Sequence, residues 1–531
     1  MDKLGLGVVS FLLIFNFRVV NGGMVSSCSQ TPYPEICNSF ISTNPLATLE
    51  ETKLGFRDVA LGVTMHQAER AYQLVSAMDL SSFDERAKLA WTDCLELFED
   101  TVTQLNRSIG SKNPTSMKDA QTWLSAAITN QQTCQNGLTE LNSSSHLAFF
   151  PFMFTNFSKL LSNSLAINKA AVGSSSATLF DKKGGDRRLL SNGYPTWVSV
   201  ADRKLLQSSG RTAASKADVV VAKDGSGNYK TITEAVAASA KLRSGAKRFV
   251  IYVKAGIYKE NVEIKRSMKD LMFIGDGIDA TVVTDSKNVQ DGSTTFRSAT
   301  FAVSGDGFIA QDMTFENTAG PQKHQAVAFR SGSDKSVLYS CSFKGYQDTL
   351  YVYSQRQFYR NCDIYGTVDI IFGDAIAVLQ NCNIYVRRPM SNQMNTITAQ
   401  GRTDPNENTG ISIHNSRVTA ASDLKPVQGS FKTYLGRPWQ KYSRTVFIKT
   451  SLDSLVDPAG WLQWSGNFAL STLYYGEYMN TGSGAGTSGR VKWQGFHVIR
   501  NAAEASKFTA GNFLAGDSWI PATGVPFTSG L

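Results

Sequence analysis

A short motif recurs at a nearly constant spacing in the second half of this 531-residue chain. Cys341, Cys362 and Cys382 follow one another at nearly equal intervals, and each follows a run of apolar or aromatic residues. Four segments share the pattern: 337–343, 358–364, 378–384 and 412–418. A period of about 20 residues without a helix in each repeat predicts a parallel β-helix, whose coils bury their inward side chains against one another. A β-sandwich is the alternative, but it gives no reason for a motif that returns at a fixed phase.

Two aspartates follow the same spacing. The interval from Asp348 to Asp369 equals the interval from Cys341 to Cys362, so coils of that length place the two aspartates side by side on neighbouring coils. Paired carboxyl groups in a partly apolar site separate their pKa values, so one stays ionised while the other keeps a proton. Arg437 is a candidate for the cation that selects the ionised partner, because a guanidinium binds a carboxylate with two hydrogen bonds. The pattern therefore predicts a nucleophile or base beside a general acid.

Other residues near these motifs suit a reaction on a sugar derivative. Trp439 and Tyr351 are candidates for a floor on which sugar rings stack. Gln347 and Gln325 offer amide N–H donors that would hold a developing oxyanion. The sequence contains no Gly-x-Ser-x-Gly elbow and nothing that resembles a Ser-His-Asp triad.

The region from residue 23 to about 180 has a different pattern, in which apolar residues recur every three or four positions. This periodicity predicts helices over Leu49–Leu80, Ala87–Leu105 and Met117–Leu141. Short loops between such helices predict an antiparallel bundle. Three Asn-x-Ser sequons fall in this region and are candidate glycosylation sites: Asn106, Asn142 and Asn156.

The N-terminus is typical of a signal peptide, which we place at residues 1–22. Lys3 supplies a positive charge, an apolar run follows over Val8–Phe15, and small residues lie near Gly22. Export predicts an oxidising compartment and disulfide bonds. Four of the seven cysteines lie between Cys28 and Cys134 and three lie late, so each group is expected to pair internally, leaving at least one late cysteine free or paired elsewhere.

Charge is distributed unevenly along the chain. Residues 1–210 carry 18 basic and 18 acidic residues, whereas residues 211–531 carry 35 basic and 26 acidic residues, a net charge of +9. A basic surface favours an anionic partner, and export makes an acidic polysaccharide a better candidate than nucleic acid. The absence of a Cys-x-x-Cys pair and the scattered histidines argue against a structural zinc site.

A linker rich in Gly, Ser and charged residues separates the two regions, and we place it at residues 181–210. It contains Arg187-Arg188-Leu189-Leu190 and Arg203-Lys204-Leu205-Leu206. Exposed dibasic sites in an extended linker are accessible to a processing protease. The duplicated pattern at a domain boundary therefore predicts proteolytic cleavage.

Five segments resemble the signature motifs of plant pectin methylesterases, and they occur in the order of that family. They are Gly256-Ile257-Tyr258-Lys259-Glu260, Gln325-Ala326-Val327-Ala328-Phe329-Arg330, Gly345-Tyr346-Gln347-Asp348-Thr349-Leu350-Tyr351, Asp369-Ile370-Ile371-Phe372-Gly373 and Tyr434-Leu435-Gly436-Arg437-Pro438-Trp439. The match spans residues 217–531. The N-terminal region resembles, more loosely, the inhibitor-like pro-domain of the same family.

The resemblance implies an all-β, right-handed parallel β-helix as catalytic domain at residues 211–531, preceded by an all-α four-helix bundle at residues 23–180. It implies a carboxylic ester hydrolase that removes methyl groups from homogalacturonan in the plant cell wall. Asp369 is the implied nucleophile and Asp348 the implied acid and base, with Gln325 and Gln347 as oxyanion donors and Arg437 holding Asp369. Substrate contacts are then expected from Thr295, Gln325, Arg437, Trp439, Tyr351 and Phe372.

The resemblance also implies disulfide bonds Cys28–Cys37 and Cys94–Cys134, and we expect Cys341 to pair with Cys362. The linker tetrads resemble the family's processing sites, which implies a subtilisin-like protease as partner. A proteinaceous pectin methylesterase inhibitor is a further expected partner. We expect a monomer without a membrane anchor, and the resemblance implies no metal and no organic cofactor.

Three other functions compete with this interpretation. A polygalacturonase-type glycoside hydrolase is also a β-helix with paired carboxylates, but its Asn-Thr-Asp, Asp-Asp and Gly-His-Gly elements are absent here. A pectate lyase would need acidic clusters that bind calcium, and none is evident. A binding or inhibitory protein without activity would have no use for Asp348, Asp369 and Arg437 together.

Overall fold

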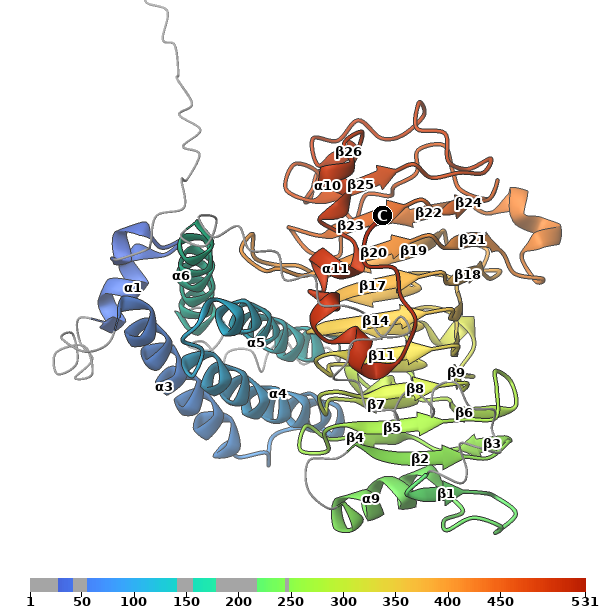
Figure 1. Cartoon of the computed structure of the whole chain (residues 1–531), viewed down its shortest axis with the longest axis horizontal. Coiled ribbons are helices and arrows are strands. Elements are labelled where there is room, and N and C mark those ends of the chain that lie inside the picture. The colour runs from blue at the N-terminus through green and yellow to red at the C-terminus, as the bar shows by residue number, and fades with distance from the viewer. Residues whose placement is uncertain (1–26, 42–54, 141–155, 178–216, 244–247) are drawn as a thin grey trace, which may run out of the picture.

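The computed structural model describes residues 27–41, 55–140, 156–177, 217–243 and 248–531. Figure 1 shows two parts that lie side by side, a helical part and a stack of short strands. The predicted signal peptide, both dibasic tetrads, the whole predicted linker and Asn142 lie outside the described residues. The predicted glycosylation sites Asn106 and Asn156 lie within them, and Asn106 is exposed on a helix.

The helical part contains four long helices that pack as a bundle, in which α4 contacts α3 and α5, and α6 closes the ring against α5 and α3. Their bounds are α3 Phe56–Ser76, α4 Glu85–Ile109, α5 Pro114–Glu140 and α6 Ser158–Ala177; the short α1 (Pro34–Ile41) and η1 (Cys28–Gln30) precede them. Asp84 begins α4 by accepting the Ala87 N–H at 2.7 Å, as N-capping carboxylates do. The predicted bundle is confirmed, and α6 is a helix that the periodicity did not define.

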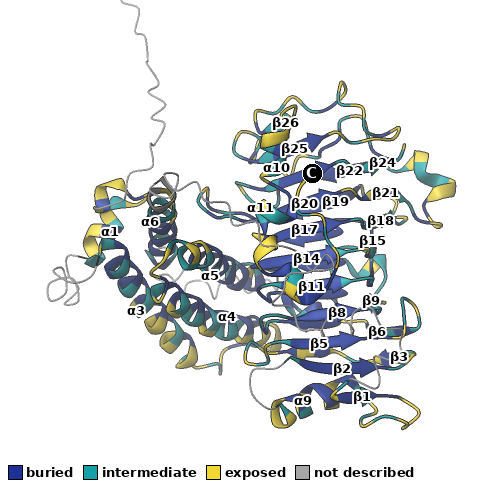
Figure 2. Ribbon diagram, viewed as in Figure 1, coloured by how far each residue is buried: buried dark blue, intermediate teal, exposed yellow. Residues whose placement is uncertain are grey.

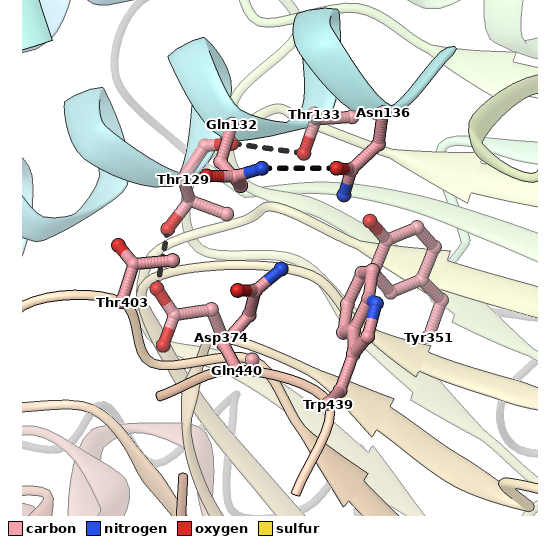
Figure 3. Close-up of a pocket in the computed structure, with 10 residues that line it drawn as sticks. Thr129, Gln132, Thr133, Asn136, Tyr351, Asp374, Thr403, Trp439 and Gln440 are labelled. Carbon is pink, nitrogen blue, oxygen red and sulfur yellow. Dashed lines mark hydrogen bonds between the residues drawn. The ribbon is translucent and has the colours of Figure 1, made fainter. Parts of the chain in front are cut away.

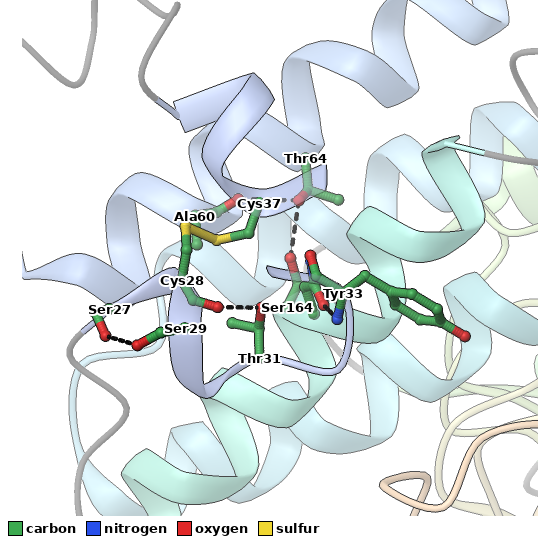
Figure 4. The surroundings of a disulfide bond; sticks show 10 residues. Ser27, Cys28, Ser29, Thr31, Tyr33, Cys37, Ala60, Thr64 and Ser164 are labelled. Atoms are coloured by element: carbon green, nitrogen blue, oxygen red, sulfur yellow. Dashed lines mark hydrogen bonds between the residues drawn. A yellow bond between two sulfur atoms is a disulfide. The ribbon is translucent and has the colours of Figure 1, made fainter. Parts of the chain in front are cut away.

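Two disulfide bonds hold the bundle, and both match the predicted pairs. Cys28 is bonded to Cys37 across η1 and α1, as Figure 4 shows. Cys94 is bonded to Cys134, which joins α4 to α5. Closing a loop in this way restricts the unfolded chain and so stabilises the folded bundle.

The second part is a parallel β-helix built of three sheets, which confirms the predicted fold. An eleven-stranded sheet contains β1 Val219–Val221, β2 Phe249–Val253, β5 Leu271–Ile274, β8 Ile309–Gln311, β11 Ser336–Tyr339, β14 Arg356–Arg360, β17 Ile376–Gln380, β20 Gly410–His414, β23 Arg444–Ile448, β25 Tyr474–Tyr478 and β26 Phe496–Val498. A seven-stranded sheet contains β4 Val262–Ile264, β7 Phe301–Val303, β10 Phe329–Ser331, β13 Leu350–Val352, β16 Ile371–Gly373, β19 Asn395–Gln400 and β22 Thr433–Gly436. An eight-stranded sheet contains β3 Gly256–Lys259, β6 Thr281–Asp285, β9 Thr314–Asn317, β12 Ser342–Lys344, β15 Asp363–Gly366, β18 Asn383–Val386, β21 Arg417–Ala420 and β24 Ser451–Leu452.

The sequence repeat is the coil of this solenoid. Val337 pairs with Phe358, Phe358 with Val378, and Val378 with Ser412, so the four repeated segments lie in register. Inside the coils, buried phenylalanines pack on one another, such as Phe315 and Phe343 with ring centroids 5.7 Å apart. Figure 2 shows these strands as a continuous buried stack.

Helices lie at the first end of the stack and along the outer face of the eleven-stranded sheet, although the sequence pattern indicated almost no helix after residue 217. At the first end lies α9 (Ile232–Leu242), which begins with a capping box formed by Thr231 and Glu234. The C-terminal segment adds α10 Ala502–Ser506, α11 Ala510–Phe513, η7 Gly516–Ser518 and η8 Ile520–Thr523, and single 3-10 turns lie between strands at η4 Phe296–Ser298, η5 Pro321–Lys323 and η6 Lys425–Ser430. Within the residues described, no helix combines the length and the apolar character that crossing a bilayer requires.

The predicted Cys341–Cys362 bond is wrong, because all three late cysteines are free and buried. Their side chains point in parallel into the coil interior, where Cys341 Sγ donates to Ala310 O at 3.5 Å and Cys362 Sγ to Leu338 O at 3.4 Å. Burial raises the pKa of Cys341 to about 12. Burial also raises the pKa of Cys362, so thiols rather than thiolates occupy positions 341 and 362, and the thiol form does not form disulfides readily.

This arrangement predicts the reactivity of the thiols. In the folded, non-reduced protein, a maleimide is expected to label none of Cys341, Cys362 and Cys382, because burial excludes the reagent. In guanidinium chloride without reductant, three thiols per chain are expected to react. Mass spectrometry of the labelled chain gives the count, and a single labelled thiol in denaturant would indicate a bridge among the three.

Candidate active site

The two aspartates lie side by side on neighbouring coils. Each precedes a strand of the seven-stranded sheet by two residues, and the strands are in register through Leu350 and Ile371. The Asp348 N–H donates to the Val368 carbonyl at 3.0 Å, so the main chain itself joins the two turns. Both aspartates have a left-handed backbone, with φ of 64° at Asp348 and 51° at Asp369. Aspartate tolerates this conformation better than most residues.

Arg437 binds Asp369 with both arms of its guanidinium. Arg437 extends from the end of β22 and donates from Nε to Asp369 Oδ1 at 2.8 Å and from Nη2 to Oδ2 at 2.6 Å. The Thr396 hydroxyl donates to the same Oδ1 at 2.7 Å. Because all three donors favour the ionised carboxylate, Asp369 is held as the negative member of the pair.

The surroundings of Asp348 favour the protonated form of its carboxyl group. Its side chain is buried, and loss of water raises its pKa well above the usual value for aspartate. The negative charges of Asp369 and of Glu140 raise the pKa further, while Arg437 lowers it. This geometry therefore favours one ionised and one protonated carboxyl group, as the sequence predicted.

The two glutamines occur at matching positions of adjacent coils. Gln325 and Gln347 form an isolated parallel bridge, and the Ala326 N–H donates to the Gln347 carbonyl at 3.2 Å. Both side chains are partly buried. Gln347 directly precedes Asp348, so its amide stands at the edge of the turn that carries the protonated carboxyl group.

An aromatic floor extends from the aspartates along the seven-stranded sheet. Tyr351 stacks on Phe372 with ring centroids 4.1 Å apart. Trp439 lies 5.9 Å from Phe372 and 6.5 Å from Tyr351. Trp464, which the sequence did not single out, lies over the Arg437 guanidinium at 4.4 Å. Flat apolar surfaces beside a polar centre suit a sugar ring.

Helix α5 of the bundle covers this floor. In Figure 3, Asn136 of α5 lies over Tyr351 and Trp439, and Thr129 points to Asp374. The remaining space is about 10 Å³, which is no more than room for one water molecule. The Thr129 hydroxyl donates to Asp374 at 2.8 Å, and the Tyr353 hydroxyl donates to Asn130 at 2.7 Å.

The last residue of α5 reaches the predicted substrate contact Thr295. The Thr295 N–H donates to the Glu140 carboxylate at 3.0 Å. Burial raises the pKa of Glu140, and the Thr295 amide opposes that shift. No sequence signal identified Glu140, because its importance depends on a contact between residues 155 positions apart.

The structure thus brings the predicted catalytic and substrate-contact residues to one face of the β-helix. Asp348, Asp369 and Arg437 form its polar centre, and Tyr351, Phe372 and Trp439 form its floor. Among the described residues, no three His, Cys, Asp or Glu side chains gather in a way that could hold a metal ion.

Comparison with known proteins agrees with this geometry in both parts of the chain. Residues 218–517 match the Pectinesterase family, and residues 24–167 match the plant invertase/pectin methylesterase inhibitor family. "Probable pectinesterase/pectinesterase inhibitor 6" of Arabidopsis thaliana is 55% identical over 99% of this chain and 97% of its own. "Pectinesterase 2" of Citrus sinensis is 55% identical over 95% of this chain and 94% of its own.

A solved structure titled "Pectin methylesterase from Carrot" resembles the β-helix part. It is 61% identical, covers 59% of this chain and 98% of its own, and superposes with a TM-score of 0.58. The carrot chain therefore corresponds to little more than the β-helix. Sequence, fold and relatives together show that this chain belongs to the pectinesterase family and carries an N-terminal domain of the plant invertase/pectin methylesterase inhibitor family.

Proposed function

We propose that the β-helix part hydrolyses the methyl esters of homogalacturonan to pectate and methanol, with Asp369 as the nucleophile and Asp348 as the acid and base. One observation supports this most directly: Arg437 binds both oxygens of Asp369 while burial favours the protonated form of Asp348. An ionised carboxylate beside a carboxylic acid is the pair that acyl transfer to a carboxylate requires.

In the first half of the reaction, Asp369 attacks the C6 carbonyl carbon of a methylated galacturonate. The carbonyl oxygen becomes an oxyanion, which the side-chain amides of Gln325 and Gln347 stabilise. The intermediate then expels the methoxy group, and Asp348 gives it a proton. Methanol leaves, and the galacturonate acyl group stays on Asp369 as an anhydride, while Asp348 is now ionised.

In the second half, Asp348 acts as a base. It takes a proton from a water molecule, whose oxygen attacks the acyl carbon. The bond to Asp369 breaks, so the product leaves as galacturonic acid, which then gives its proton to the solvent, and both aspartates return to their initial states. Arg437 is a positioning residue, because its two hydrogen bonds fix the attacking oxygens of Asp369.

The aromatic floor is proposed to hold the polymer. Sugar rings would lie on Tyr351, Phe372 and Trp439, with further contacts from Thr295, Gln325 and Arg437. The net charge of +9 over residues 211–531 suits a substrate that becomes more anionic as its esters are removed.

We further propose that the protein is exported to the cell wall as a precursor. Residues 1–22 would be removed as a signal peptide, and a subtilisin-like protease would cut within residues 181–210 at one of the two dibasic tetrads. This division leaves residues 23–180 as pro-domain and 211–531 as a monomeric enzyme. The carrot structure supports it, because 98% of that chain aligns within 59% of this one.

The pro-domain is proposed to restrain activity until the linker is cut. Helix α5 lies on the floor where sugar rings would bind, and each of the two pockets between them holds only about 10 Å³. Charge holds the helices in place as well, since Arg266 pairs with Asp100 at 2.7 Å and Arg107 pairs with Asp306 at 3.1 Å. A polymer cannot reach the aspartates while α5 occupies the floor.

A glycoside hydrolase with paired carboxylates is the competing function. It would release reducing sugar ends from the polymer, whereas an esterase releases methanol and leaves chain length unchanged. Measuring both products from one pectin sample separates the two reactions.

Substituting the nucleophile gives the first test. Asp369→Asn keeps the left-handed backbone and the side-chain size but removes the nucleophilic oxygen, so methanol release is expected to fall about 10³-fold or more. Binding of pectin should change little. Asp363→Asn on β15, in another sheet, is the matched control. Near-normal methanol release from Asp369→Asn would remove Asp369 from this role.

The raised pKa of Asp348 predicts a pH-dependent effect on stability. A carboxyl group whose pKa is higher in the folded than in the unfolded chain loses stabilisation as pH rises through the folded value. Asp348→Asn should therefore raise the melting temperature relative to the unmodified chain at neutral pH, and the gain should vanish at pH values below the unfolded pKa. Thermal unfolding over a pH series measures this. An equal gain at every pH would contradict the proposed cause.

Restraint by the pro-domain is tested with the linker. Methanol release by the full chain is expected to rise by roughly an order of magnitude or more after the linker is cut and the helical part removed, because the floor is then open. The same full chain left uncut, at equal concentration, is the control. Equal rates of methanol release before and after cleavage would show that α5 does not block the aromatic floor.

A further inference from the structure

The strand that carries Arg437 lies against one turn from the next coil. Arg437 directly follows β22, and residues 457–464, here called the supporting turn, lie beside the end of that strand. The Leu462 N–H of the supporting turn donates to the Gly436 carbonyl at 3.0 Å. The ring of Trp464, from the same turn, packs on the Arg437 guanidinium. The supporting turn therefore contacts both the main chain before Arg437 and its side chain.

A buried ion pair holds the supporting turn. Arg490 and Glu477 are each only 2% exposed. Arg490 donates from Nε to Glu477 Oε1 at 2.7 Å and from Nη2 to Oε2 at 3.1 Å. Its Nη1 donates to the Pro458 carbonyl at 3.1 Å. Gly460 has a left-handed backbone with φ of 71°, and a side chain at this position would collide with Arg490. Arg490 thus packs directly against the supporting turn.

Glu477 reaches the same turn through a tryptophan. The indole N–H of buried Trp461 donates to Glu477 at 3.3 Å, and Trp461 forms a parallel bridge with Gly436, the last residue of β22. Trp461 also stacks on Tyr475 with ring centroids 4.1 Å apart. Burial raises the pKa of Tyr475, and the negative charge of Asp369 raises it further. This stack therefore lies within electrostatic range of the proposed nucleophile.

The ion pair supplies direction rather than simple cohesion. Removing two charges from water is costly, and apolar residues of similar volume often stabilise a core equally well. A guanidinium differs from an apolar side chain because its donors are fixed in one plane. Here those donors bond at once to Glu477 and to the carbonyls of Pro458 and Gly484. The supporting turn is thereby fixed in one position relative to β25, which carries Glu477.

We infer that Arg490 and Glu477 are positioning residues, which hold Arg437 and through it the nucleophile Asp369 by fixing the supporting turn. The inference rests on the proposed function and extends it to residues outside the site described above. Arg437 places two donors on two oxygens at once, so a small shift of β22 weakens both hydrogen bonds. A misplaced carboxylate attacks more slowly although the polymer still binds. The effect is therefore expected on kcat rather than on KM.

The test uses the enzyme obtained from the full chain by cutting the linker and removing the helical part. Methanol release from one highly methylated pectin gives kcat and KM. The main variant combines Arg490→Met with Glu477→Gln, so that neither charge is left buried alone and the glutamine still accepts from Trp461. Its kcat is expected to fall about tenfold, while KM changes by less than about twofold.

Two further variants separate position from stability. Arg490→Lys keeps a charge beside Glu477 but lacks the planar fork, so its kcat is expected to lie between those of the unmodified enzyme and the main variant. It takes the place of the main variant if that protein does not fold. Phe273→Leu on β5 removes core volume in an earlier coil. It should lower the melting temperature and leave kcat unchanged.

The route through Arg437 is tested by repeating the main substitutions in an Arg437→Lys background. Lysine cannot bind both oxygens of Asp369 with a fork. The ion pair then has no fork to position, so its replacement is expected to lower kcat little further.

An equal fold-loss of kcat in both backgrounds would show that the pair acts independently of Arg437, and it would overturn the inference. An unchanged kcat in the folded main variant would do the same, as would an equal loss of kcat in Phe273→Leu. In each of these cases, methanol release by the unmodified enzyme still supports the esterase. No methanol from the unmodified enzyme overturns the proposed function, and the inference with it.

Discussion

The hydrogen-bonded pair of Arg437 and Asp369 determines the chemistry of the whole site. Two carboxyl groups on adjacent coils would otherwise repel each other and share their protons without preference. The guanidinium binds both oxygens of one of them, so the negative charge stays on Asp369 and the proton stays on buried Asp348. The roles of nucleophile and acid proposed above rest on this single asymmetry, because the two side chains are otherwise chemically identical.

The solenoid supplies the geometry that this pair needs. Residues separated by one full coil become direct neighbours because successive coils hydrogen-bond in register. The coil between Cys382 and Ser416 is longer than the coil between Cys362 and Cys382, yet Val378 and Ser412 still pair. Most of the extra residues lie in the turns, although β19 is also longer than β16. The turns around the aromatic floor can therefore differ in length without moving Asp348 and Asp369.

Much of this architecture could be predicted from the sequence, because it depends on local periodicity. The motif spacing predicted that Asp348 and Asp369 would be neighbours, and the three-to-four spacing predicted the bundle. The prediction of a Cys341–Cys362 bond was wrong because a fixed period shows only which residues stack on one another. It does not show that both side chains point in parallel toward carbonyl oxygens. Glu140, Thr396 and Trp464 were missed for another reason. Each acts through a contact with a residue far away in sequence, and no short motif records such contacts.

The main chain that carries the two aspartates also determines how the site would respond to heat. The Asp348 N–H is bonded directly to the neighbouring coil, so the reacting groups are part of the stack rather than of a separate flap. A solenoid is stabilised by the interfaces between neighbouring units, and loosening one turn would disturb the next. Catalytic competence and backbone order are thus expected to disappear at the same temperature, with no inactive but still folded state in between.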